Sequence, residues 1–286
     1  SLMEVNSFME WRKSGLKKII FILMILIVGT VYAGNATYKK NKKILTSIQA
    51  VYSIAKSLTE GTNIEVYSIF DSDVSMDYGK SAFDNKDLDL SSAKDAVAVV
   101  DVARVWGNDY LYEYARRKNI RIIEIDASYS FSGNDYLSLS LLNYKNGDSN
   151  PYVWMSFQNV IKMANIIADD LSELFPEDSK RIEDNLINFS QEIKEIENEY
   201  LEKTLDLSSL SVITPTENLD YLFNDLNIFF NYVDSNELTV EKISEVMKRN
   251  NSKIFVSDRW IKKEIINEIE KKGGKFLVLD NFNIPR

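Results

Sequence analysis

Apolar and polar residues alternate along the chain with two different periods, and each change of period marks a predicted element. Short apolar runs bounded by polar residues predict strands, and apolar residues recurring every three or four positions predict helices. In the first half of the chain, strands are predicted at residues 43–47, 64–70, 96–102 and 120–125, and helices at 49–58, 110–118 and 157–174. This alternation indicates an α/β sheet whose parallel strands are joined by crossover helices.

The longest helical pattern follows Pro176, a residue type that suits the first turn of a helix. Its apolar positions recur every three or four residues, without Gly or Pro between them: Ile182, Leu186, Phe189, Ile193, Ile196 and Tyr200. About 26 helical residues would extend roughly 39 Å, more than a crossover within one compact lobe needs. The strand and helix pattern then restarts, with strands at 210–214, 253–256 and 275–279 and helices at 219–226, 240–249 and 262–271. We therefore predict two α/β lobes, each a mostly parallel sheet flanked by helices, joined by one long helix.

The amino-terminal residues have the order of a secretory signal peptide. Basic residues lie between positions 12 and 18, residues 19–28 are all large and apolar, and Val31 and Ala33 suit a cleavage site. The uninterrupted apolar run is shorter than the roughly 20 residues of a membrane span, although residues 19–33 could serve as an uncleaved anchor. We therefore expect an exported protein, periplasmic or otherwise extracytoplasmic, with this segment bringing it near the membrane. The expected parts are residues 1–34 as signal peptide or membrane anchor, 35–176 as the amino-terminal lobe, 177–205 as the linking helix and 206–286 as the carboxyl-terminal lobe.

Composition narrows the class of protein. The chain of 286 residues is 45% hydrophobic, which suits a packed globular fold, and its formal charge of -9 argues against nucleic acid binding. It contains no Cys, so neither disulfides nor a lipid-modified amino-terminal cysteine are available, and we expect no lipoprotein. It also contains no His, which removes the commonest metal ligand and the usual general base at neutral pH. Because neither a nucleotide-binding loop nor an acid–base pair is visible, an enzyme is the least supported class, and we expect none.

Several segments together resemble one family of binding proteins. Residues 150–154 have the sequence Asn-Pro-Tyr-Val-Trp, followed by Ala-Asn-Ile-Ile-Ala at 164–168 and Pro-Glu-Asp at 176–178, with further parallels at 75–78, 212–221 and 276–280. The chain thereby resembles the cluster A-I solute-binding proteins, the zinc and manganese receptors of ABC importers. The resemblance implies a periplasmic-binding-protein-like fold with a metal in the interlobe cleft, and it implies an importer permease and ATPase as partners.

The resemblance also assigns ligand positions in this chain. The family's usual phrase at the second ligand is Asp-Pro-His-x-Trp, so Tyr152 stands where a histidine is expected. Carried over by motif, the four ligand positions fall on Met76, Tyr152, Thr216 and Asp280, with Asp77 and Glu217 as neighbouring candidates. Of the four, only Asp280 keeps the residue type that the family uses.

These four ligand positions offer zinc one good donor, the carboxylate of Asp280. Zinc needs about four nitrogen, thiolate or carboxylate ligands at roughly 2.0–2.3 Å. We therefore expect weak or absent zinc binding and no certain cofactor. A Tyr152 phenolate beside Asp280 and Glu217 would instead suit a hard ion such as ferric iron, so a weakly bound divalent or ferric ion is left open. The other interpretation is a Tyr152 that packs in the cleft beside a hydrogen-bonded Asp280.

Two other clusters carry weaker signals. Asp71, Asp73, Asp77 and Asp84 form an acidic stretch without the glycine and bidentate glutamate of a calcium loop, so we expect a solvated loop. Aromatic residues are dense between positions 105 and 152, where they could line a cleft for an organic ligand or peptide; ordinary packing is favoured. They are Trp106, Tyr110, Tyr112, Tyr114, Tyr129, Phe131, Tyr136 and Tyr144.

Taken with the resemblance, these features predict the extracytoplasmic solute-binding component of a metal-type ABC importer, with a degenerate or non-zinc site between its lobes. The alternative is a non-transporting cell-surface or adhesin-like interaction protein that keeps the fold without binding metal. In either case we expect a monomer.

Overall fold

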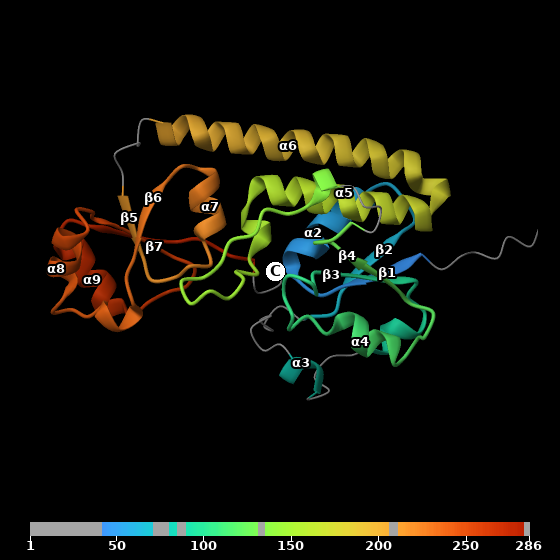
Figure 1. Cartoon of the computed structure of the whole chain (residues 1–286), viewed down its shortest axis with the longest axis horizontal. Coiled ribbons are helices and arrows are strands. Elements are labelled where there is room, and N and C mark those ends of the chain that lie inside the picture. Colours follow the sequence, from blue (N-terminus) through green and yellow to red (C-terminus); the bar gives the residue numbers. More distant parts are fainter. Residues whose placement is uncertain (1–41, 71–79, 85–89, 131–134, 206–210, 283–286) are drawn as a thin grey trace, which may run out of the picture. The chain divides into compact units, whose positions relative to one another are not determined.

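The computed structural model describes residues 42–70, 80–84, 90–130, 135–205 and 211–282 (Figure 1). Residues Lys42–Arg286 form one compact unit. The predicted signal segment, Met76 and Asp77 lie outside the described residues. Within the described part of the chain, no helix is both long and apolar enough to cross a membrane.

Four parallel strands form the sheet of the amino-terminal lobe, in the order β2-β1-β3-β4. They are β1 (Lys43–Thr46), β2 (Glu65–Ser68), β3 (Ala98–Asp101) and β4 (Ile123–Asp126). All four predicted strands of this lobe are thereby confirmed. Ile44 on β1 pairs with Val66 on one side and with Ala98 on the other. Strand order reverses between β1 and β3, so the carboxyl ends of these two strands form a topological switch point.

Helices cover both faces of this sheet (Figure 1). They are α2 (Gln49–Leu58), α3 (Lys80–Asp84), α4 (Leu111–Arg116) and α5 (Phe157–Leu174). Neighbouring residues of one strand enter different hydrophobic clusters, because Ile44 packs on the side of α2 and α5 whereas Leu45 packs with Leu111 of α4. Coverage on both faces explains why β1 and β3 are apolar and buried along most of their length. Short 3₁₀ helices lie at Leu90–Lys94 (η2), Asp135–Leu137 (η3), Val153–Met155 (η4) and Pro176–Asp178 (η5).

The carboxyl-terminal lobe repeats this topology, with four parallel strands in the order β6-β5-β7-β8. The strands are β5 (Ser211–Thr214), β6 (Phe229–Tyr232), β7 (Ile254–Ser257) and β8 (Lys275–Val278). The helices are α7 (Asp220–Asp225), α8 (Ile243–Arg249) and α9 (Lys263–Lys271), with η6 at Ser235–Glu237. Three of the strands and all three α-helices match predicted elements, whereas β6 was not predicted. The equivalent switch point lies between the carboxyl ends of β5 and β7.

Two glycines make the turn that leads into β8. Gly273 has a φ of +76°, in the left-handed region that favours Gly. A Cβ atom on Gly274 would lie 2.6 Å from Met247 Cε and 2.8 Å from the carbonyl oxygen of Lys253. A hydrogen at this position is therefore what lets α8 and the start of β7 pack against the turn.

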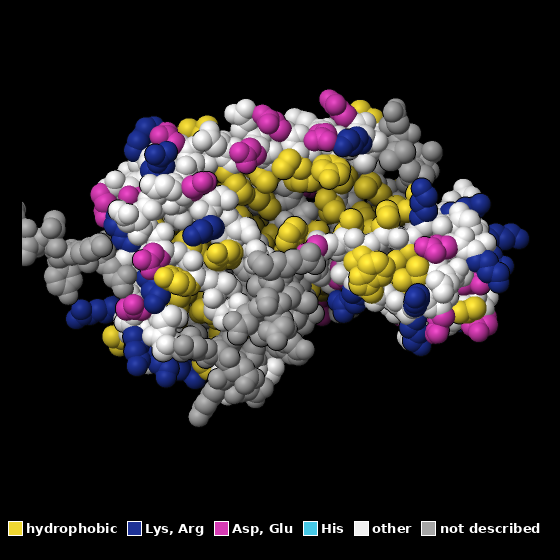
Figure 2. Space-filling view, turned by 180° about the vertical axis from the view of Figure 1, so that it is seen from behind, with side chains coloured by type: hydrophobic (Ala, Val, Ile, Leu, Met, Phe, Trp, Pro, Cys, Tyr) yellow, Lys and Arg dark blue, Asp and Glu magenta, His cyan; other side chains and the backbone are white. Residues whose placement is uncertain are grey.

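The long predicted helix is α6 (Ser179–Leu205), which continues from η5. Near its start, Asn185 Nδ2 donates to the carbonyl oxygens of Leu58 and Glu60 in the amino-terminal lobe, at 2.9 and 2.8 Å. Near its end, Thr204 Oγ1 donates to the carbonyl oxygen of Leu226 in the carboxyl-terminal lobe, at 3.3 Å. The helix runs alongside α5 and contacts α2 (Figure 1), and hydrophobic side chains gather beneath it (Figure 2). A helix that bridges two lobes is therefore confirmed.

The largest hydrophobic cluster is continuous from one lobe to the other. It contains Trp154 and Ile182 from the amino-terminal side together with Val212, Tyr221 and Phe223 from β5 and α7. Smaller clusters fill the far side of each sheet. Because the lobes share buried apolar surface, their junction is part of the core.

Candidate ligand site between the lobes

A cavity of about 450 Å³ opens at the junction of the two lobes. It is bordered by the segments that follow β3, β5 and β7 and by the loop before η4, so it lies outside the carboxyl ends of strands at both switch points. The lining residues are Val105, Trp106, Gly107, Asn108, Tyr144, Asn146, Asp148, Ser149, Pro151, Tyr152, Asn218 and Arg259. This position is where open α/β sheets bind their ligands.

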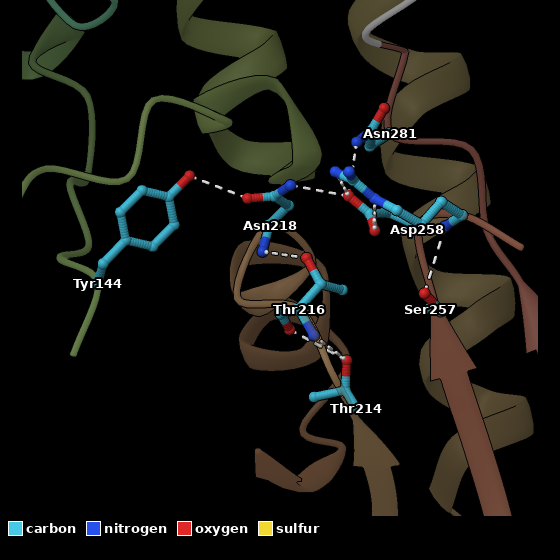
Figure 3. Close-up of polar contacts among 8 residues, drawn as sticks. Tyr144, Thr214, Thr216, Asn218, Ser257, Asp258 and Asn281 are labelled. Atoms are coloured by element: carbon cyan, nitrogen blue, oxygen red, sulfur yellow. Dashed lines mark hydrogen bonds and ion pairs between the residues drawn. The ribbon is translucent and has the colours of Figure 1, made fainter. Parts of the chain in front are cut away.

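A buried carboxylate forms hydrogen bonds with the residues that the carboxyl-terminal lobe contributes to the wall of this cavity (Figure 3). The side chain of Asp258, directly after β7, is 1% exposed. Its Oδ2 atom accepts hydrogen bonds from Asn218 Nδ2 at 2.7 Å and from Asn281 Nδ2 at 2.9 Å. Its Oδ1 atom accepts from Arg259 Nε at 3.2 Å. One carboxylate thus orients two cavity-lining side chains, Asn218 and Arg259.

Direct hydrogen bonds connect this wall to the amino-terminal lobe. Tyr144 Oη donates to Asn218 Oδ1 at 2.9 Å (Figure 3), and Trp154 Nε1 donates to the carbonyl oxygen of Asn281 at 2.9 Å. A third contact runs through Tyr221, whose hydroxyl donates to the carbonyl oxygen of Asn150 at 3.0 Å. The loop of residues 144–154 is consequently bonded to the other lobe at several points along its length.

The structure places Tyr152 in the cavity wall. Tyr152 is 3% exposed, and the centroid of its ring lies 5.3 Å from that of the Trp154 ring. The backbone N–H of Tyr152 donates to Asn150 Oδ1 at 3.0 Å, and this hydrogen bond stabilises the turn that positions Tyr152. The side chain expected at the cleft by resemblance therefore borders the interlobe cavity.

The other predicted ligand positions have local roles. Thr216 Oγ1 accepts from the backbone N–H of Asn218 at 3.2 Å (Figure 3), which shapes the turn after β5. Asp280 Oδ1 accepts from the backbone N–H of Phe282 at 2.9 Å. Glu217 Oε2 accepts from the backbone N–H of Lys145 across the junction at 2.6 Å. Thr216, Glu217 and Asp280 are not among the described residues that border the cavity.

Sequence reasoning missed the residues that organise the site: Asn218, Asp258, Arg259 and Asn281. Each follows a predicted strand, or the turn after one, at the carboxyl edge of the sheet. That position is itself a signal, because strand ends at a switch point face the ligand crevice. Applying this rule to the carboxyl-terminal lobe would have singled out the Ser257-Asp258-Arg259 stretch.

Within the described ranges, no three His, Cys, Asp or Glu residues are arranged to hold a metal ion. The densest buried acidic group lies in the amino-terminal lobe, at the ends of β3 and β4. Burial, and then the nearby Asp109, raises the pKa of Asp101 well above its ordinary value. Burial likewise raises the pKa of Asp109 to about 6, although Ser47 and the backbone N–H groups of Val102 and Leu111 donate to this carboxylate. Asp101 and Asp109 therefore favour the protonated form, and among the described residues this group does not form a cation site.

The aromatic segment between positions 105 and 152 divides between two roles. Trp106 and Tyr144 line the cavity. Tyr110 and Tyr114 instead pack around Phe83, with ring centroids 6.3 and 5.1 Å away. Ordinary packing therefore accounts for Tyr110 and Tyr114, while Trp106 and Tyr144 border the cavity and Phe131 lies outside the described residues.

Two parallel α/β lobes that share a core, a bridging helix and a cavity at facing strand ends form a two-lobed fold of the periplasmic-binding-protein kind. The family model described as zinc-uptake complex component A, periplasmic, or ZnuA, matches residues 44–285. The chain therefore belongs to the ZnuA family. This family comprises solute-binding components of metal-type ABC importers, which are binding proteins and not enzymes.

Solved structures share the fold at low sequence identity. A crystal structure of ZnuA is 18% identical with a TM-score of 0.65, covering 84% of this chain and 91% of that one. A mutant of FpvC from Pseudomonas aeruginosa is 18% identical with a TM-score of 0.69, covering 85% and 91%. Zn(II)-bound AdcA from Streptococcus pneumoniae is 19% identical with a TM-score of 0.67, and the match covers 86% of this chain and 52% of AdcA. A comparison with curated protein sequences gives no match.

Proposed function

We propose that this chain is the extracytoplasmic receptor of an ABC importer and that its interlobe site does not hold bare zinc in the family manner. The observation that carries the proposal is the lining of the cavity at the lobe junction. Tyr152, Asn218 and Arg259 border it, and Asp148 is the single carboxylate among its described lining residues. Zinc needs about four nitrogen, thiolate or carboxylate donors, and the guanidinium of Arg259 carries a positive charge that repels a cation.

Membership of the ZnuA family supports a role with an importer permease and its ATPase. A receptor of this kind works outside the cytoplasmic membrane, with residues 1–34 as its export signal or anchor. A single copy suffices for this task, because both walls of the cavity come from one chain.

Isothermal titration of the purified chain with Zn²⁺, Mn²⁺ and Fe³⁺ tests the site. We expect no submicromolar zinc affinity in the wild type. Tyr152→His, which restores one family-type ligand, is expected to bind zinc no more than weakly, since one imidazole does not complete the donor set. Submicromolar zinc binding by the wild type would overturn the non-zinc site.

Affinity purification of the chain from membranes of its own host tests the transport role. We expect to recover an ABC permease with its ATPase. Recovery of a non-transporter surface partner, without these two, would point instead to the adhesin-like alternative.

A further inference from the structure

We propose that the interlobe cavity binds a small organic anion and that Arg259 engages its carboxylate. This inference rests on the proposed receptor function, and it names the class of ligand for that site. Size gives the first reason. The cavity of about 450 Å³ falls within the roughly 300–1,000 Å³ of small-molecule sites, far above the space of one ion held by atoms about 2 Å away.

The chemistry of the lining gives the second reason. Among the described residues that border the cavity, the polar groups other than those of Arg259 and Asp148 are uncharged amides, hydroxyls and an indole, such as those of Asn108, Asn218 and Trp106. Amide, hydroxyl and indole N–H or O–H groups donate hydrogen bonds to oxygen atoms, as a guanidinium does. The planar guanidinium fork also matches the two oxygens of a carboxylate, which makes Arg a selective group for that class.

The support behind Arg259 gives the third reason. Asp258 is 1% exposed at its side chain, whereas the Arg259 side chain is 65% exposed. Most of the Arg259 side chain is therefore accessible to solvent, although Asp258 accepts from its Nε and Nη2 atoms. Asp258 holds Arg259 through Nε at 3.2 Å and holds Asn218 through Nδ2 at 2.7 Å. Side chains fixed before binding lose less freedom when a ligand arrives, so this wall is preorganised.

The experiment compares Arg259→Gln with Arg249→Gln. Both changes remove one positive charge from an exposed, ion-paired Arg of the same lobe, and Arg249, paired with Glu237 at 2.9 Å, does not border the cavity. Each full-length variant is purified without denaturant and extracted, and its small-molecule content is measured by mass spectrometry. Citrate, as a defined organic anion, is then titrated by calorimetry. Thermal melting checks that each variant is folded.

We expect the wild type and Arg249→Gln to retain an organic acid or to bind citrate, and Arg259→Gln to lose at least tenfold in content or affinity. Arg259→Lys is expected to fall between them, because it keeps the charge and loses the fork. The proposal is overturned if neither the extract nor the citrate titration depends on Arg259. If binding does not depend on Arg259 and zinc is not bound either, only the proposed class of ligand is refuted. Submicromolar zinc binding would instead refute the proposed non-zinc site.

Discussion

Two buried aspartates of this chain have opposite surroundings. Asp258 accepts from Asn218, Asn281 and Arg259, so its charge is matched by donors. Asp101 is fully buried, and its Oδ2 atom has no hydrogen-bond partner among the described residues. A buried carboxylate with charge-assisted hydrogen bonds stabilises the fold, whereas an unsatisfied one costs free energy when it ionises.

Asp258→Asn is expected to lower the free energy of unfolding by about 1.5–3 kcal/mol, the usual worth of hydrogen bonds to a buried charged group. The new amide would place a donor among the amide donors of Asn218 and Asn281. Urea denaturation at neutral pH measures the change. Glu264→Gln, at an exposed position in the first turn of α9, serves as control and should stay within about 0.5 kcal/mol. Equal stability of the two variants would contradict the assigned role of Asp258.

At the residue scale, the motifs located the segments of the site better than its side chains. Tyr152 was predicted at the cleft and lies in the cavity wall. Thr216 was predicted as well, but its hydroxyl accepts from the backbone N–H of Asn218, and Asn218 is the side chain that reaches the cavity. Which side chain of a turn faces inward depends on backbone hydrogen bonds that a motif match does not specify.

At the scale of elements, helical periodicity located α5 and α6 well, because each has a long apolar stripe. The edge strand β6 escaped prediction for the opposite reason. Its four residues include an exposed Phe229, and the others are only partly buried, so no strand-like alternation is visible. Pairing with β5 is what makes this segment a strand.

The isoleucines of α6 are buried unevenly, which a matched pair of substitutions can test. Ile182 is fully buried, whereas Ile187 on the same helix is 57% exposed. Ile182→Ala is expected to lower the free energy of unfolding by about 2–5 kcal/mol, since it leaves a cavity in the core. Ile187→Ala should change it by less than about 1 kcal/mol. Urea denaturation followed by circular dichroism measures both, and similar losses would contradict the assigned role of the buried Ile182 in holding the helix on the core.

At the scale of the whole molecule, acidic groups outnumber basic ones, 43 to 34, and both kinds are interspersed on the face in Figure 2. Several carboxyls are partly or fully desolvated. Burial, and then the neighbouring Glu217, raises the pKa of Asp220 to about 7, and burial raises that of Asp109 to about 6. The fold therefore favours the protonated form of these groups more than the unfolded chain does.

The sign of the resulting pH dependence follows from linkage. Carboxyls with a raised pKa stabilise the fold fully below their unfolded value, near 3.8, and this stability is lost as the pH rises through about 6 and about 7. We expect the free energy of unfolding to fall between about pH 5 and about pH 8. Urea midpoints across this range, at constant ionic strength, measure the slope. A flat or rising profile would contradict it.

The variant Asp101→Asn tests how much of this pH dependence comes from one residue. The amide resembles the protonated acid and cannot ionise, so the variant should match the wild type below about pH 4 and exceed its stability increasingly as the pH rises, by about 1–3 kcal/mol at about pH 8. Asp95→Asn, at an exposed surface position, should keep the wild-type slope. Parallel slopes for all three proteins would remove Asp101 as a cause.

The sequence by itself determined the architecture of this protein and all of its described strands except the edge strand β6. Apolar periodicity is a local property, and strands that alternate with helices can bury their apolar faces in few ways. It also showed which familiar metal ligands are missing, because composition needs no coordinates. Only the tertiary structure decided what stands in their place. Asn218, Asp258 and Asn281 are distant in sequence and meet only when the strand ends converge, and that meeting presents Arg259 to the cavity.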